Sequence, residues 1–257
     1  MNQSPILSIR GLSKTITLHI LDGTTVEPFR DVTFDVQEGE FVVVVGPSGS
    51  GKSSIVKTVH RTYLATGGEA WFRRDDGSLV DLVSTSDRTV VQLRRQEIGF
   101  VSQFLKVEPR VAALDVVAGP LMRRGVEEEP ARDRAMELLD ALAVPRRLWC
   151  SYPTLFSGGE QQRINIARAL IGEPRLLLAD EPTSALDADN TGRVVELLMQ
   201  ARRRGVTILG VFHDINLIER LADRVIVMRN GRVAAEGRVG EVEIPRYETT
   251  QEFAPRV

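Results

Sequence analysis

The sequence predicts an α/β fold built on a mostly parallel β-sheet, and two patterns carry this prediction. Short, continuous apolar runs rich in β-branched residues are typical of strands that are buried on both faces of a sheet. Four such runs occur, at residues 41–46, 175–180, 207–214 and 224–228. Helical patterns separate the later runs, most clearly at residues 191–204 and 215–222. This alternation indicates a doubly wound sheet with helices on both faces.

The N-terminal part of the chain predicts a separate antiparallel layer. The stretches ILSIRGL and DVTFDV alternate between apolar and polar residues, and turn dipeptides occur at 22–23 and 38–39. Both features are typical of strands joined by turns. Segment 68–82 continues the layer as a predicted hairpin around the Asp-Gly dipeptide at 76–77.

Residues 104–156 predict a helical insertion, because no buried-strand run occurs in them. Pro130 suits a first helical turn, and apolar residues follow it at spacings of three, four and seven, namely Ala135, Leu138, Leu139 and Leu142. We therefore divide the chain into a core formed by 1–103 and 157–235, a helical subdomain at 104–156, and a C-terminal tail at 236–257.

The composition excludes some classes of partner. The 257 residues include 33 basic and 35 acidic side chains, a net charge of −2, so no overall charge attracts nucleic acid or anionic membranes. We expect no nucleic-acid partner. Pairs of arginines recur, and short basic runs of this kind are expected to be solvated faces rather than docking surfaces. These pairs are at 73–74, 94–95, 123–124 and 146–147, together with the triplet at 202–204.

The sequence also predicts a cytoplasmic location. Cys150 is the single cysteine, which leaves no intrachain disulfide and makes a reducing compartment the expectation. No stretch approaches the roughly 18 apolar residues of a membrane span, and the first ten residues lack the pattern of a signal peptide. Any membrane-spanning part is therefore expected on another chain.

The segment GPSGSGKS at 46–53 has the spacing of a phosphate-binding loop, lying between the first apolar run and a predicted helix at 54–64. Backbone N–H groups of such a loop surround phosphates, Lys52 reaches the β- and γ-phosphate oxygens, and the Ser53 hydroxyl coordinates Mg²⁺. A P-loop NTPase is therefore predicted. Its nucleotide-binding residues are Gly46, Pro47, Ser48, Gly49, Ser50, Gly51, Lys52, Ser53 and Ser54.

Two carboxylates follow the apolar run at 175–180. Nucleotide hydrolysis needs a further metal ligand and a group that positions water. Asp180, at the end of the predicted strand, can hold Mg²⁺, and Glu181 can polarise water. The alternative is that a carboxylate at this place caps the next helix.

The stretch LFSGGEQQRINIARAL at 155–170 predicts a helix N-terminus with an unusual start. Ser157 and Glu160 form the pattern of a capping box. That pattern does not account for Gly158 and Gly159, because glycine destabilises a helix by roughly 1 kcal/mol relative to alanine. Glycines at a helix start permit close approach of an anion to the backbone N–H groups. Ser157, Gly158, Gly159 and Glu160 are called the signature segment below.

Six elements together resemble the ATP-binding-cassette (ABC) ATPase family. They occur in that family's order and approximate spacing over residues 5–235. They are GPSGSGKS at 46–53, Gln103 in VSQF, SGGEQ at 157–161, Asp180-Glu181, SALD at 184–187 and His213 in FHD. The resemblance implies a RecA-like sheet with an antiparallel layer and an inserted helical subdomain.

The resemblance also implies roles for these residues. The signature segment faces the P-loop of a second ABC ATPase subunit, identical or related, across a shared ATP. Mg²⁺ is held by Ser53, Asp180 and Gln103. Glu181 is the catalytic base, His213 contacts the γ-phosphate, and Gln103 and Lys52 complete the catalytic set.

Two departures from the family pattern concern the nucleotide base and the signature. The family commonly has an aromatic residue near position 16, whereas this chain has Ile16, so stacking on adenine is lost or supplied by His19 or Phe29. The signature commonly ends in glutamine, whereas this one ends in Glu160.

Finer features suggest a biological role. The segments at 99–121 and 144–170, including Trp149, resemble the ATP-binding subunit of the phosphonate carbon–phosphorus lyase system. Packing under the signature helix is the simpler explanation for Trp149. The first hypothesis is an ATPase that acts on a cytoplasmic carbon–phosphorus lyase complex.

The alternative hypothesis is the membrane-peripheral ATPase of a lipoprotein-releasing or peptide-exporting transporter, with a permease partner beside Gln103. The segment at 94–117 resembles the corresponding segment of those cassettes. Cassette proteins of translation or DNA maintenance normally carry two cassettes or a coiled coil, and neither occurs here.

Overall fold

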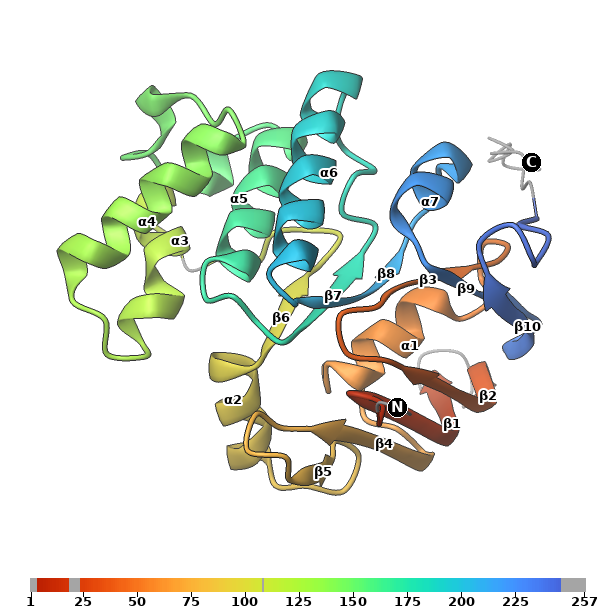
Figure 1. The fold of residues 1–257 in the computed structure, drawn as a ribbon. Helices are drawn as coiled ribbons and strands as arrows, with labels where there is room; N and C mark the ends of the chain where they lie inside the picture. Colours follow the sequence, from red (N-terminus) through yellow and green to blue (C-terminus); the bar gives the residue numbers. More distant parts are fainter. Residues whose placement is uncertain (1–3, 19–23, 108, 246–257) are drawn as a thin grey trace.

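The computed structural model describes residues 4–18, 24–107 and 109–245, and it confirms a mostly parallel sheet. Six strands lie in the order β10-β9-β3-β8-β7-β6 (Figure 1). Every neighbouring pair is parallel except β10 with β9. The strands are β3 (Phe41–Val45), β6 (Ile98–Val101), β7 (Leu176–Asp180), β8 (Thr207–Val211), β9 (Arg224–Arg229) and β10 (Arg232–Arg238). Each of the four predicted apolar runs forms one of these strands.

The central strands are buried on both faces, as their continuous apolar sequence predicts. In β3, Phe41, Val43 and Val45 belong to one hydrophobic cluster and Val42 and Val44 to the other. Alternate residues of a strand point to opposite faces, so the two clusters lie on the two sides of the sheet. Four helices of the core are α1 (Lys52–Val59), α5 (Gly158–Leu170), α6 (Ala188–Arg203) and α7 (Ile215–Leu221).

A four-stranded sheet forms the predicted antiparallel layer, in the order β2-β1-β4-β5. Its strands are β1 (Leu7–Leu18), β2 (Thr24–Val36), β4 (Gly67–Arg73) and β5 (Leu79–Asp81). The β4–β5 hairpin turns at the predicted dipeptide, where Gly77 has φ 80° and its N–H donates to the Arg74 carbonyl at 3.0 Å. The predicted turn at 22–23 lies outside the described residues.

Between residues 104 and 156 the described chain contains helices and no strand. It contains α3 (Ala113–Met122), α4 (Glu128–Ala141) and two short 3-10 helices, η1 (Arg146–Leu148) and η2 (Pro153–Leu155). Helix α4 begins two residues before Pro130, which therefore lies in its first turn. Helix α5 packs against both α3 and α4 (Figure 1), so the start of α5 is held by the helical insertion.

Three local features differ from the sequence prediction. The helix after the P-loop ends at Val59 rather than at residue 64, because Arg61 adopts the left-handed conformation, φ 65°, and terminates it. Helix α2 (Asp87–Gln96) and strand β6 were not predicted. The short run IGFV at 98–101 is the signal that could have indicated β6.

Candidate nucleotide-binding site

The loop between β3 and α1 carries the P-loop motif at 46–53, and its glycines allow its shape. Gly51 precedes α1 with φ 96°, in the left-handed region, and a methyl group there would clash with the carbonyl oxygen of Pro28. Only glycine fits such a position without strain. Among the described residues no side chain caps α1, so its first backbone N–H groups are available to an anion.

Lys52, the first residue of α1, folds back over this loop. Its Nζ donates hydrogen bonds to the carbonyl oxygens of Gly46 and Pro47, each at 2.8 Å. Burial lowers the pKa of Lys52, and the nearby carboxylates of Glu181 and Asp180 act in the opposite direction. The ammonium group is thus held at the loop by the carbonyl oxygens of Gly46 and Pro47.

Asp180 ends β7 and is completely buried. Its Oδ2 lies 2.9 Å from Nζ of Lys57 on α1, an ion pair without hydrogen-bond geometry. Neither carboxylate oxygen accepts a hydrogen bond from any described residue, so Asp180 has unused acceptor capacity. The sequence analysis missed Lys57, whose only signal was a basic residue on the helix after the P-loop.

The donor set fits Mg²⁺ held jointly with a nucleotide. Mg²⁺ prefers oxygen ligands and is usually bound by one or two protein groups plus substrate phosphates. Two groups supply such oxygens: the Asp180 carboxylate, which accepts no hydrogen bond from a described residue, and the hydroxyl of Ser53, a residue that lines the cavity beside the P-loop. The described residues contain no group of three or more His, Cys, Asp or Glu side chains that could hold a metal alone.

The Glu181 carboxylate contacts two other predicted residues, His213 and Gln103. Its Oε1 lies 2.7 Å from Nε2 of His213, and its Oε2 accepts a hydrogen bond from Nε2 of Gln103 at 3.5 Å. The backbone is fixed in the left-handed region, φ 53°, and its N–H donates to the Val211 carbonyl at 3.1 Å. Residues from the carboxyl ends of three adjacent strands, β6, β7 and β8, therefore converge on one carboxylate.

The contact with His213 affects the ionisation of Glu181. The hydrogen bond from His213 is the largest cause that lowers the pKa of Glu181, and the charges of Lys52 and Lys57 act in the same direction, whereas burial opposes them. Glu181 is consequently ionised at neutral pH. An ionised carboxylate only accepts hydrogen bonds, so the N–H at Nε2 of His213 donates a hydrogen bond to Glu181.

A cavity of about 350 Å³ lies beside the P-loop and is open to this pair. It is lined by β2 and P-loop residues together with Glu181 and His213. Phe29 is completely buried in the core, so the expectation that it stacks on adenine is wrong. His19 lies outside the described residues. Val26 and Pro28, which the sequence analysis did not single out, line the cavity instead.

The signature segment starts α5 with the predicted capping box. The Ser157 backbone N–H donates to Glu160 Oε2 at 2.9 Å, and the Glu160 N–H donates to Ser157 Oγ at 3.3 Å. Hydrogen bonds to its carboxylate from the backbone N–H and from the hydroxyl of Ser157 lower the pKa of Glu160. Gly159 also lies close to the Ala185 carbonyl, 3.0 Å from where a methyl group would stand. Ser157 and Gly158 are exposed, and no signature residue lines the cavity beside the P-loop.

Comparison with known proteins gives the same family. The sequence profile described as ABC transporter matches residues 29–184. The methionine import ATP-binding protein MetN of Carboxydothermus hydrogenoformans is 37% identical over 229 residues, which cover 88% of this chain and 66% of that protein. The glutamine transport ATP-binding protein GlnQ of Geobacillus stearothermophilus is 33% identical over 231 residues, which cover 89% of this chain and 92% of that protein.

Solved structures agree with the sequence relatives. The dimeric structure of MJ0796, a bacterial ABC transporter cassette, matches with a TM-score of 0.82 at 32% identity and covers 91% of this chain and 98% of that one. A second dimeric structure of that cassette, in a post-hydrolysis state bound to ADP and phosphate, matches with a TM-score of 0.81. With the P-loop, the buried aspartate and the glutamate–histidine pair in place, the chain is an ATP-binding-cassette ATPase and belongs to the ABC transporter family.

Proposed function

We propose that the chain hydrolyses ATP in a two-subunit sandwich as the ATP-binding subunit of a membrane transporter. One observation carries the hydrolytic part of this proposal: Glu181, held by His213 and Gln103, opens onto the cavity beside the P-loop. An ionised carboxylate next to a phosphate-binding loop is placed to act as a general base.

The chemistry follows from these groups. Glu181 takes a proton from a water molecule while the water oxygen forms a bond to the γ-phosphorus of ATP. The bond between that phosphorus and the β–γ bridging oxygen breaks, and ADP leaves with the bond's electrons. Lys52 offsets negative charge on the β- and γ-phosphates, and His213 holds the Glu181 carboxylate in position until it accepts the proton.

Mg²⁺, held by Ser53, Asp180 and Gln103 together with the phosphates, would neutralise charge on the β- and γ-phosphate oxygens. Of these residues, Gln103 is exposed and follows β6, next to Glu181. Its position allows it to report the presence of nucleotide to the helical insertion.

The position of the signature segment supports the sandwich. Its Ser157 and Gly158 are exposed and contribute nothing to the cavity beside their own P-loop. A helix N-terminus of this kind can serve the γ-phosphate of an ATP held by a second subunit. The dimeric structure of the similar cassette MJ0796 supports this arrangement.

The division of the chain into a core at 1–103 and 157–235, a helical subdomain at 104–156 and a C-terminal tail at 236–257 stays a prediction.

The transporter role is favoured over the carbon–phosphorus lyase role. The relatives named above are import or transport ATP-binding proteins. The phosphonate hypothesis rests on sequence resemblance, and Trp149, one of its distinguishing features, is explained by packing. That side chain is buried in the core and its Nε1 donates to the Val144 carbonyl at 3.0 Å.

One experiment separates the two roles. Tagged Glu181→Gln protein is purified from its native cells with ATP and Mg²⁺ present, and co-purifying chains are identified by mass spectrometry. Wild-type protein purified without nucleotide is the control. A polytopic membrane protein among the partners is the expected result. Soluble carbon–phosphorus lyase subunits would overturn the transporter proposal in favour of the phosphonate hypothesis.

A further inference from the structure

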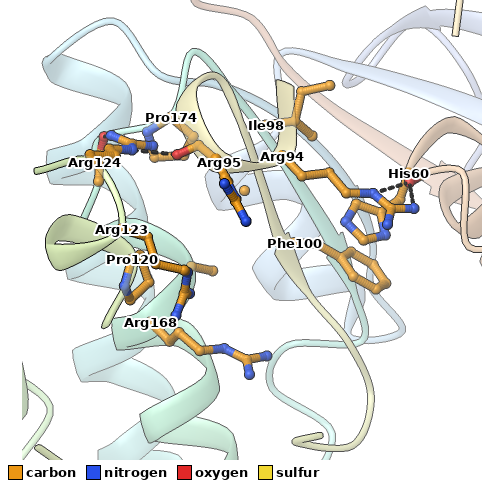
Figure 2. Close-up of a pocket in the computed structure, with 13 residues that line it drawn as sticks. His60, Arg94, Arg95, Ile98, Phe100, Pro120, Arg123, Arg124, Arg168 and Pro174 are labelled. Carbon is orange, nitrogen blue, oxygen red and sulfur yellow. Dashed lines mark hydrogen bonds between the residues drawn. The ribbon is translucent and has the colours of Figure 1, made fainter. Parts of the chain in front are cut away.

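A second cavity, of about 210 Å³, lies at the junction between the core and the helical insertion. Figure 2 shows its lining side chains, which come from the residue after α1, the end of α2, strand β6, the end of α3 and helix α5. No residue of the P-loop lines it, and neither Glu181 nor His213 does. It is therefore distinct from the nucleotide site.

The lining of this cavity is strongly basic. Among the described residues that line it are five arginines and no aspartate or glutamate. Within the described part of the chain none of the five forms an ion pair with a carboxylate, although many other arginines of the protein do. We call these five side chains the arginine cluster: Arg94, Arg95, Arg123, Arg124 and Arg168.

Neutral groups hold part of the cluster in place without neutralising it. Arg94 donates to the His60 carbonyl at 2.9 Å, and Arg168 donates to the Lys106 carbonyl at 2.7 Å. Arg124 donates to the Gln96 and Gly172 carbonyls, at 3.0 Å and 2.5 Å. Carbonyl oxygens orient a guanidinium group but carry no net charge, so the positive charge of the cluster persists.

The positive charges of the cluster act on one another and on the neighbouring His60. Burial and the charges of Arg94 and Arg168 lower the pKa of His60 to about 3, so this histidine is neutral and stacks on Phe100 with ring centroids 4.2 Å apart. Burial lowers the pKa of Arg168, and the charge of Arg123 lowers it further. Arginine nonetheless stays protonated in proteins, so a bound anion would relieve this repulsion.

We propose that the arginine cluster is a binding site for a carboxylate or phosphate group, which bridges the core and the helical insertion. Planar guanidinium groups pair with both kinds of anion through two parallel hydrogen bonds. The ligand would join Arg94, Arg95 and Arg168, on the core side, to Arg123, in the helical insertion. The inference concerns a different site from the proposed transporter chemistry and does not depend on it.

Thermal unfolding in inorganic phosphate, with ionic strength held constant by sodium chloride, tests this site. A ligand that binds only the folded protein raises the melting temperature, by about 3 °C at ten times its Kd for a chain of this size. The P-loop also binds phosphate, so the titration is repeated on Lys52→Ala, which should retain the shift that belongs to the cluster.

The decisive variant is Arg95→Gln combined with Arg123→Gln. Both side chains are exposed, and neither donates a hydrogen bond to another described residue, so the double variant should fold normally. We expect it to lose the phosphate shift in the Lys52→Ala background. The matched control is Arg193→Gln, an exposed arginine on α6 outside the cavity, which should keep the shift.

A glutamate-rich peptide, tested in the same way, identifies the source of the anion. An arginine-dependent shift with phosphate supports a free anion as ligand. A shift with the peptide alone supports carboxylates carried by a partner chain. If neither probe gives a shift that the double variant abolishes, the proposal is overturned.

Discussion

Nε2 of His213 lies 2.7 Å from Oε1 of Glu181, and the register of two neighbouring strands produces this contact. In the parallel pair β7 and β8, Asp180 stands opposite Val211. Glu181 directly follows Asp180, and His213 follows Val211 by two residues, so the two side chains leave the same edge of the sheet together. A one-residue slip of either strand would separate them.

Glu181→Gln should retain ATP binding and lose hydrolysis. The amide keeps the size of the side chain but cannot accept a proton, and general-base catalysis typically contributes about 10²- to 10⁴-fold in rate. We expect kcat for phosphate release to fall within that range and a dimer to accumulate on size-exclusion chromatography with ATP and Mg²⁺. Glu219→Gln, an exposed carboxylate on α7, is the control. A variant that stays monomeric under these conditions would contradict the sandwich.

His213→Ala should move the acid limb of the pH–rate profile to higher pH. The hydrogen bond from His213 lowers the pKa of Glu181, so its loss raises that pKa. Because Glu181 must be ionised to accept a proton, activity disappears as pH falls through its pKa, and this point is reached earlier in the variant. Profiles of kcat from neutral pH down to below 4.5, the ordinary pKa of a glutamate, measure the effect. His213→Gln, which keeps an N–H donor, should lie closer to wild type, and coincident acid limbs for wild type and His213→Ala would refute the argument.

Lys52→Ala should weaken nucleotide binding by about 100-fold, because a charged donor to phosphate is worth up to about 3 kcal/mol. Binding of a fluorescent ATP analogue measures the change. Lys106→Ala removes an exposed lysine near Gln103 and should bind as wild type does. Unchanged affinity in Lys52→Ala would show that the P-loop assignment is mistaken.

The sequence predicts the sheet and the P-loop well because local patterns determine both. Continuous β-branched runs specify strands buried on two faces, and the spacing of glycines with Lys52 specifies the loop. The same reasoning missed β6, since four residues at 98–101 are too short to show a period. It misjudged the helix after the P-loop because the left-handed conformation of Arg61 is set by tertiary contacts.

Contacts between distant segments could not be predicted. The arginine pairs at 94–95 and 123–124 look like separate solvated faces in the sequence, yet the fold brings them to one cavity with Arg168. Likewise, the sequence makes Phe29 a candidate for stacking on adenine. Only its burial in the core excludes it from that role. Both cases depend on which side of an element faces inward, which a single sequence does not specify.

Two glycine substitutions should have opposite effects on stability. Gly51→Ala places a methyl group at φ 96° and against the Pro28 carbonyl, and we expect a loss of about 2 kcal/mol in the free energy of unfolding. Gly192→Ala, inside α6, meets nothing within 4 Å and should gain about 0.5 to 1 kcal/mol from helix propensity. Urea unfolding measures both. A Gly51→Ala protein as stable as wild type would contradict the loop geometry.

The ion pair between Lys57 and Asp180 should matter for folding even without nucleotide. Asp180 is buried, whereas Lys57 is about a quarter exposed, at 24% of its side-chain surface. Lys57→Met keeps most of the packing but leaves an uncompensated buried carboxylate, a change that costs about 3 to 5 kcal/mol when both partners are fully buried. We expect about 2 to 3 kcal/mol here, since water reaches the lysine and screens part of the interaction.

A double-mutant cycle separates this electrostatic effect from lost packing. Asp180→Asn removes the negative charge, so adding it to Lys57→Met should recover most of the stability measured by urea unfolding without nucleotide. If the losses of the two single variants simply add, the ion pair does not stabilise the fold. Recovery in the double variant would instead show that Lys57 neutralises the carboxylate until Mg²⁺ and ATP arrive. The charge of the aspartate that would hold the metal would then be balanced by a residue that the P-loop motif itself does not include.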